Sequence, residues 1–166
     1  MTVEMQAFDE LDEATAQQLL LGCAAVPRWA AALVAARPYA DPAALVARAE
    51  ELAAGWTGAE VVQALADHPR IGERHPGTGD AARHSAGEQA GIAAGDSDVA
   101  ARLAAGNRAY EERFDRIFLV RAAGRSAEEV LDLLEQRLTH DPLTELAVTA
   151  GQLREIAVRR VRGLVS

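Results

Sequence analysis

The sequence is poor in cysteine, in aromatic residues and in long apolar runs. Cys23 is the only cysteine, which excludes an internal disulfide and a cysteine-rich metal site. We expect it to be a buried, inert thiol within the apolar stretch 19–26. Aromatic residues make up only 4% of the chain, so a core must be built from Ala, Leu and Val. No apolar run approaches the roughly 18 residues that a membrane span needs.

Positive charge is also scarce. The chain has 17 Lys and Arg against 25 Asp and Glu, a net charge of -8. Such a chain repels nucleic acid and anionic membrane surfaces, and we expect neither as a partner. A small anionic substrate stays possible, because a local Arg outweighs a distant net charge. The acidic residues 1–12 carry no signal pattern, so we expect a cytoplasmic protein.

The chain is rich in alanine, and it is long enough to form one hydrophobic core. Hydrophobic residues make up 49% of its 166 residues, and alanine, the strongest helix former, dominates them. This length fits one domain and leaves little room for two. The composition therefore predicts an all-α protein, a single compact domain over residues 1–166 with about eight helices.

Start and stop signals divide the chain into helical segments. Asp41-Pro42 and Asp141-Pro142 each place an N-cap before a proline at the first helical position. Residues 57–60 and 126–129 have the form of capping boxes. A long loop rich in Gly and Pro is expected at 70–80, and 117–120 is either extended or helical. The predicted helices are 11–23, 27–37, 41–54, 57–67, 85–95, 98–114, 126–138 and 142–164.

His68 stands where a helix must stop, because Pro69 forbids a simple continuation. A helix C-terminus favours the imidazolium form, and histidine is the side chain whose charge changes nearest neutral pH. His68 is therefore a candidate for proton exchange with a substrate lying over the following loop. The alternative is a structural histidine that bonds the last carbonyls of the helix.

Ser85, Glu88 and Gln89 admit two interpretations. In the first, Ser85 is an N-cap and Glu88 closes a capping box, with Gln89 a solvated neighbour. In the second, the three side chains surround a pocket at a helix N-terminus, where exposed N–H groups suit an anionic or amide-rich ligand. A carboxylate beside a carboxamide can hold a urea-like group by donor–acceptor pairing.

Metal and nucleotide sites lack support in the sequence. The four histidines lack the His-x-x-x-His spacing of metal ligands on a helix, and no HExxH element accompanies them. Walker loops, Rossmann glycine patterns and nucleophile elbows are also missing. We therefore expect no metal and no cofactor. The histidines are His68, His75, His84 and His140.

Three segments resemble one family in their order and separation. Residues 68–73 read His-Pro-Arg-Ile-Gly-Glu, and residues 85–91 read Ser-x-x-Glu-Gln-x-Gly. The third motif lies within residues 107–118 and consists of Asn107, Tyr110, Arg113, Phe114 and Phe118. A Gly124-Arg125-Ser126 step follows it. In combination these motifs resemble the decarboxylases of 2-oxo-4-hydroxy-4-carboxy-5-ureidoimidazoline, abbreviated OHCU. Weaker matches to the same family lie at 137–138, 145–146 and 156–159.

This resemblance implies an all-helical domain, commonly a homodimer, that removes CO2 from OHCU to give (S)-allantoin without a cofactor. It implies that His68 acts as the acid/base and that Glu88 orients the substrate or shares its proton traffic. The substrate would be a small anionic ureido-imidazoline. Ser85 and Gln89 would hold the ureido and ring groups of the substrate. The implied substrate-binding residues are Pro69, Ser85, Gln89 and Phe118.

The chain departs from the family at two places. Asp115 replaces a usual Gly, and Ala123 stands where many members carry a substrate-binding Arg. In an extended segment Arg121 would point to the same side as residue 123, so Arg121 is the candidate substitute. Two alternatives follow: a related enzyme acting on another ureido or imidazoline acid, and a non-catalytic helical interaction protein that has lost its site.

Overall fold

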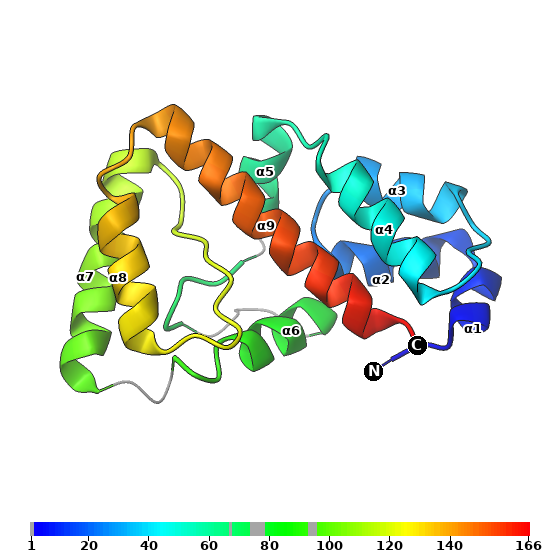
Figure 1. Ribbon diagram of the computed structural model, residues 1–166, viewed down its shortest axis with the longest axis horizontal. Helices are drawn as coiled ribbons and strands as arrows, with labels where there is room; N and C mark the ends of the chain where they lie inside the picture. The colour runs from blue at the N-terminus through cyan, green and yellow to red at the C-terminus, as the bar shows by residue number, and fades with distance from the viewer. Residues whose placement is uncertain (1, 67, 74–78, 93–95) are drawn as a thin grey trace. The chain divides into compact units, whose positions relative to one another are not determined.

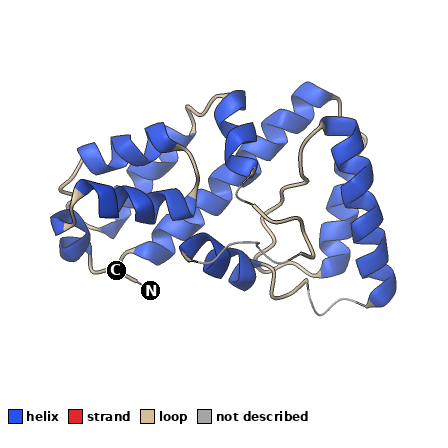
Figure 2. Cartoon of the chain, turned by 180° about the vertical axis from the view of Figure 1, so that it is seen from behind, coloured by secondary structure: helices blue, strands red, loops and turns tan. Residues whose placement is uncertain are grey.

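The computed structural model describes residues 2–66, 68–73, 79–92 and 96–166, and their regular secondary structure is helical (Figures 1 and 2). The all-α prediction is confirmed. Each of the eight predicted segments overlaps a helix, although 85–95 overlaps only the end of one, and one short helix, α1, was not predicted. None of the described helices combines the length and apolarity that a bilayer crossing requires. The helices are α1 (Met5–Glu10), α2 (Glu13–Cys23), α3 (Pro27–Ala35), α4 (Pro42–Ala53), α5 (Gly58–Leu65), α6 (Asp80–Glu88), α7 (Ser97–Phe114), α8 (Ala127–Arg137) and α9 (Pro142–Leu164).

The predicted helix starts are largely confirmed by side-chain caps. Asp41 accepts a hydrogen bond from the amide of Ala44 at 2.8 Å, with Pro42 at the first position of α4. Ser126 and Glu129 form both halves of a capping box at α8. These caps satisfy backbone N–H groups that have no partner within the helix, which is why the local pattern sets the start.

Helix α6 begins earlier than predicted, so the capping box at Ser85 and the alternative pocket at a helix N-terminus are both wrong in placing Ser85 at a helix start. The N-cap is Gly79, whose φ of 105° suits a residue without Cβ. Ser85 therefore lies inside the helix and is buried, while Glu88 is its last residue. The Gln89 amide donates to the Ser85 carbonyl at 3.1 Å. The polar cluster thus sits at the C-terminal end of α6; the end predicted at 95 falls outside the described residues.

The chain forms two compact units. Unit 1 comprises Met1–Ala64 and Arg154–Ser166. Helices α2, α3 and α4 pack in succession there. The buried Trp29 donates its indole N–H to the Ala49 carbonyl at 3.0 Å. Val3 pairs with Val165 in an isolated β-bridge. Cys23 is fully buried, as expected from the sequence.

Unit 2 comprises Leu65–Leu153, and its centre is the packing of α7 against α8 (Figure 1). The two helices approach closely at Gly106, where a Cβ atom would overlap the side chain of Leu134. Aliphatic and aromatic side chains from both helices and from the connecting segments fill this core. Its buried members are Ile71, Ile92, Val99, Leu103, Tyr110, Phe114, Phe118, Val120, Ala122, Ala127, Val130, Leu131 and Leu134.

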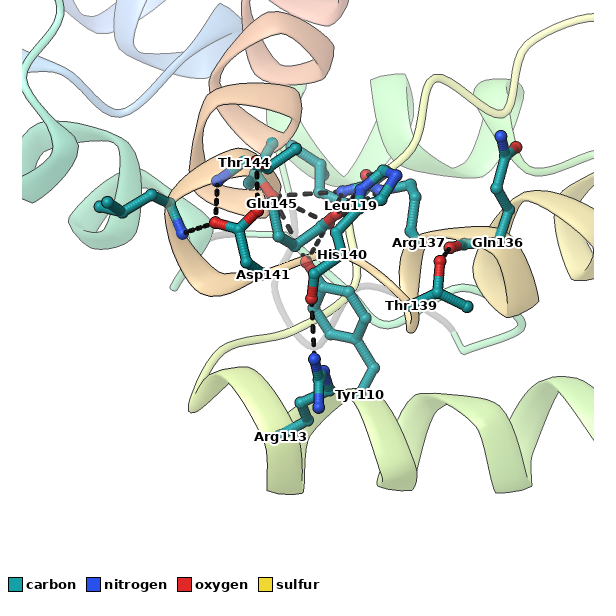
Figure 3. Close-up of polar contacts among 12 residues, drawn as sticks. Tyr110, Arg113, Leu119, Gln136, Arg137, Thr139, His140, Asp141, Thr144 and Glu145 are labelled. Atoms are coloured by element: carbon teal, nitrogen blue, oxygen red, sulfur yellow. Dashed lines mark hydrogen bonds and ion pairs between the residues drawn. The ribbon is translucent and has the colours of Figure 1, made fainter.

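A buried carboxylate lies within unit 2 (Figure 3). Glu145 is fully buried, and its Oε1 accepts hydrogen bonds from the Tyr110 hydroxyl at 2.5 Å and from Arg137 Nε at 2.8 Å. Its Oε2 lies 2.9 Å from Nδ1 of His140. One acid thereby joins α7, α8, the turn after α8 and α9.

Arg137 extends the same hydrogen-bond network to residues 117–120, which follow α7. Its Nη1 donates to the Leu119 carbonyl at 2.5 Å, and its guanidinium lies 4.7 Å from the centroid of the Phe118 ring. This contact is a cation–π interaction in a desolvated setting, where it is strongest. Residues 117–120 are therefore held as irregular backbone rather than as a helix.

The protonation of the network follows from its burial. Burial by itself would raise the pKa of Glu145, but hydrogen bonds from Arg137 and Tyr110 and the charge of Arg137 outweigh it, and that pKa is lowered. Burial, followed by the hydrogen bond to Glu145, raises the pKa of Tyr110. Glu145 is thus ionised and Tyr110 neutral at pH 7.

We predict that Glu145→Ala lowers the free energy of unfolding by about 3–5 kcal/mol, because it leaves the buried Arg137 charge uncompensated. The matched control is Glu135→Ala, which breaks the exposed Arg102–Glu135 pair between α7 and α8. Its expected cost is at most about 1 kcal/mol. Urea denaturation of the three proteins measures both values, and equal losses would contradict a special role for Glu145.

A pH dependence follows from the same carboxylate. A group whose pKa is lowered by folding stabilises the protein above its unfolded pKa, here about 4.5, and loses that contribution as pH falls through its folded pKa. We expect the urea midpoint to fall steeply below about pH 4.5 in the wild type. In Glu145→Gln part of this slope should be missing. Parallel slopes in the two proteins would show that other acids cause it.

Candidate active site

His68 lies in the turn that closes α5. The helix ends at Leu65, and the His68 amide donates to the Leu65 carbonyl at 3.0 Å. The side chains of His68 and Pro69 are partly exposed. The expectation that His68 sits at a helix end is therefore confirmed, while its part in proton transfer stays a prediction.

The backbone after Pro69 is bound on several sides. Arg70 forms a two-pronged ion pair with Glu111 of α7, with distances of 2.5 and 3.0 Å. Asn107, one turn earlier on α7, donates its Nδ2–H to the Ile71 carbonyl at 3.0 Å. These bonds fix residues 70–71 against a single face of α7, because positions four apart lie on the same side of a helix.

The second motif meets the first through a side chain. The Oε1 atom of Gln89 accepts a hydrogen bond from the Gly72 amide at 2.9 Å. Two residues later, a Cβ on Gly91 would lie 2.8 Å from the carbonyl oxygen of Arg125. The chain after α6 thus touches both the 68–73 loop and the third segment, and unit 2 brings all three motif segments together.

Arg121, the candidate carboxylate ligand, lies within that third segment. Its amide donates to Oε1 of Gln152 at 2.8 Å, and its Nη1 donates to the Ala123 carbonyl at 2.9 Å. Arg125 in turn donates from Nε to the Arg121 carbonyl at 3.0 Å. The guanidinium of Arg121 therefore lies alongside position 123, where many members of the resembling family carry their Arg.

Phe118 lies within the core of unit 2. Its side chain is buried there, with its ring centroid 5.3 Å from that of Tyr110. Arg137 covers another part of the ring. The structure thus gives Phe118 a packing role, and its contact with substrate stays a prediction.

A cavity of about 540 Å³ borders the loop after His68. Residues Arg70–Glu73 form one wall, and a face of α7 from Ala100 to Glu111 forms another. None of the described lining residues is among the site residues predicted from sequence. The cavity therefore lies between this loop and α7.

The described residues offer no cluster of three His, Cys, Asp or Glu side chains that could hold a metal ion. His75, one of the four histidines considered from sequence, lies outside the described residues.

The family model described as OHCU decarboxylase matches residues 9–162. The 2-oxo-4-hydroxy-4-carboxy-5-ureidoimidazoline decarboxylase of Amia calva is 30% identical over 141 residues, which cover 84% of this chain and 81% of that protein. The chain belongs to the OHCU decarboxylase family. It is therefore a decarboxylase.

Other relatives agree with this assignment. The "Uric acid degradation bifunctional protein TTL" of Arabidopsis thaliana is 32% identical over 108 residues, 63% of this chain, but the match spans only 33% of that protein. An OHCU decarboxylase crystallised in the presence of (S)-allantoin shares the fold with a TM-score of 0.72 at 20% identity, covering 87% of this chain and 94% of that one. An (S)-allantoin synthase aligns with a TM-score of 0.69 at 18% identity, covering 98% of this chain and 54% of that one.

Two contacts of the loop after His68 in this OHCU decarboxylase family member were not predicted from the sequence. Asn107 and Glu111 hold the loop after His68, yet Asn107 was noted only as a motif residue and Glu111 not at all. A usable signal existed for Asn107: it falls on the buried stripe of α7 with Leu103 and Tyr110. A polar side chain at such a position must find a partner, here a main-chain carbonyl.

We predict that Gly91→Ala impairs this decarboxylase, because the new methyl group would overlap the Arg125 carbonyl and push the motif segments apart. Overpacking of this kind costs about 1–3 kcal/mol of stability. Gly87→Ala is the matched control, since a Cβ there meets nothing within 4 Å. Turnover and urea midpoint are measured on both variants; equal behaviour would contradict the close approach.

Proposed function

We propose that the protein decarboxylates OHCU to (S)-allantoin in urate breakdown, without a cofactor. The single observation that carries this proposal is the meeting of the three motif segments in unit 2, through the Gln89–Gly72 hydrogen bond and the Gly91–Arg125 approach. The names of the Amia calva enzyme and of the two structural neighbours support the substrate and the product.

The chemistry of OHCU explains why amino-acid side chains suffice. Its hydroxyl and carboxylate share one ring carbon, which neighbours the carbon bearing the ureido group. When the bond to the carboxylate breaks, the electron pair is accepted by the conjugated C=N and carbonyl groups of the ring. The hydroxyl proton then leaves as a carbonyl forms, one proton is delivered to one face of the ureido-bearing carbon, and a second proton is taken up by the ring nitrogen of the former C=N bond. The enzyme must position the carboxylate and transfer protons.

We assign these tasks to the motif residues. His68 is the acid/base that exchanges a proton with the hydroxyl or the new C–H bond, and Glu88 orients the substrate or shares that proton traffic. Pro69, Ser85 and Gln89 contribute to substrate binding. Since Oε1 of Gln89 already accepts from Gly72, its Nε2 amino group is the end that donates to a ureido or ring carbonyl.

Arg121 is the proposed partner of the substrate carboxylate, in place of the residue at 123. Its bond to the Ala123 carbonyl supports this role because the guanidinium is held beside that position. Neutralising the carboxylate there holds it in place until CO2 leaves. We also propose, from the family resemblance, that the enzyme acts as a homodimer in the cytoplasm.

The second candidate substrate is another ureido or imidazoline acid, which Ala123 favours because the usual Arg is missing. Assaying OHCU beside hydantoate and allantoate under the same conditions separates the two proposals. Faster turnover of one of these acids would replace OHCU as the substrate.

We predict that His68→Asn and Glu88→Gln each lower kcat by about 10²-fold or more, the usual scale for removing an acid–base group. The substrate is generated enzymatically from urate, and its optical decay and the enantiomer of allantoin are followed. Glu112→Gln, an exposed change on α7, is the matched control and should keep wild-type turnover. If a folded Glu88→Gln protein also keeps it, Glu88 returns to a structural role.

A further inference from the structure

Two side-chain amides meet a single peptide group in the loop after His68. Asn107 donates Nδ2–H to the carbonyl of Ile71 at 3.0 Å, and Gln89 accepts the N–H of Gly72 at 2.9 Å. That carbonyl and that N–H belong to the same peptide unit. In a trans peptide they point in opposite directions, so the two carboxamides hold the plane at its two opposite edges.

The amides come from different helices. Asn107 lies in the middle of α7, and Gln89 is the C-cap of α6. The plane between Ile71 and Gly72 therefore cannot rotate without breaking a hydrogen bond at one edge. Arg70, the preceding residue, is fixed to Glu111 on the same face of α7.

Packing holds the side chain of Ile71 in the core but gives no support at Gly72. The cavity of about 540 Å³ lies along residues Arg70–Glu73, and a Cβ on Gly72 would meet nothing within 4 Å. Gly72 also has a φ of 87°, and because glycine has no Cβ its backbone could adopt several other peptide orientations. Directional hydrogen bonds are what select one of them.

Burial of the Asn107 amide is energetically unfavourable, because only one end of it is hydrogen-bonded. The side chain is 5% exposed, and its Oδ1 has no hydrogen-bond partner among the described residues. A buried unpaired acceptor is unfavourable, and an apolar side chain of similar shape would avoid it. The donor end of the amide, aimed at Ile71, is therefore the part that the position requires.

We propose that Asn107 and the side-chain carbonyl of Gln89 are positioning residues, which set the direction of the His68 imidazole by clamping the Ile71–Gly72 peptide. This inference rests on the proposed acid/base role of His68. His68 stands three residues before the clamped plane, with the rigid ring of Pro69 between them. A displacement of about 1 Å at a reacting group costs up to about 10²-fold in rate.

The test compares Asn107→Ala, Gly72→Ala and Trp29→Phe in the intact protein. Asn107→Ala removes the donor at one edge of the peptide. Gly72→Ala strains the same plane from within the backbone, and it keeps the measurement possible if the first variant fails to fold. Trp29→Phe is the matched control in unit 1, because it also deletes a side-chain N–H bonded to a buried main-chain carbonyl.

We expect Asn107→Ala and Gly72→Ala to lower kcat by about 10- to 10²-fold with KM changed by less than about threefold, since transition-state geometry is lost and ground-state binding is kept. Trp29→Phe should reduce the urea midpoint to a similar degree and leave kcat unchanged. A kcat in both loop variants equal to that of Trp29→Phe would overturn the clamp.

A double-variant cycle with His68→Asn identifies the group through which the clamp acts. If Asn107 and Gly72 work through His68, neither substitution slows the residual reaction of His68→Asn any further. The same fold loss in both backgrounds would assign the effect to general distortion and overturn the inference. Wild-type turnover in His68→Asn alone would instead overturn the catalytic assignment of His68.

Discussion

Unit 2 is organised around the ion pair between Arg137 and Glu145. A carboxylate that is fully buried among aliphatic and aromatic side chains is tolerated only when its charge is matched and its oxygens are hydrogen-bonded. Arg137 supplies two donors at 2.8 and 2.5 Å, and Tyr110 supplies a third. Because the partners come from α7, α8 and α9, none of these helices can shift without uncovering a buried charge.

The same pair reaches the candidate site through the backbone. Arg137 holds the Leu119 carbonyl, and two residues later the amide of Arg121 is held by Gln152 of α9. Extended backbone has no internal hydrogen bonds, so residues 117–121 need side-chain partners to keep one conformation. The buried network therefore serves function indirectly, by fixing the segment that carries the proposed carboxylate ligand.

Most of the helical architecture could be predicted from sequence, because local signals determine helix starts. Asp41, Ser126 and Glu129 cap the helices they were expected to cap. Ser85 shows where the same rule fails. Serine followed by glutamate three residues later also occurs inside helices, and only the neighbouring chain decides which case holds. Here the N-cap of α6 is Gly79, six residues before Ser85, and tertiary packing buries Ser85.

The contacts within the candidate site could not be predicted in the same way, since they join residues far apart in the chain. Asn107 and Ile71 are separated by 36 positions, and Gln89 and Gly72 by 17. No periodicity encodes such pairs. What the sequence did contain was their residue type: a peptide group is itself an amide, and a carboxamide offers it a donor or an acceptor without burying a charge. A carboxylate or an ammonium at Asn107 would carry a desolvation cost that this nearly buried position cannot offset. The Ile71–Gly72 peptide beside His68 is thus held by neutral amides, next to the exposed Arg70–Glu111 ion pair, whereas the segment that leads to Arg121 is held by a buried ion pair.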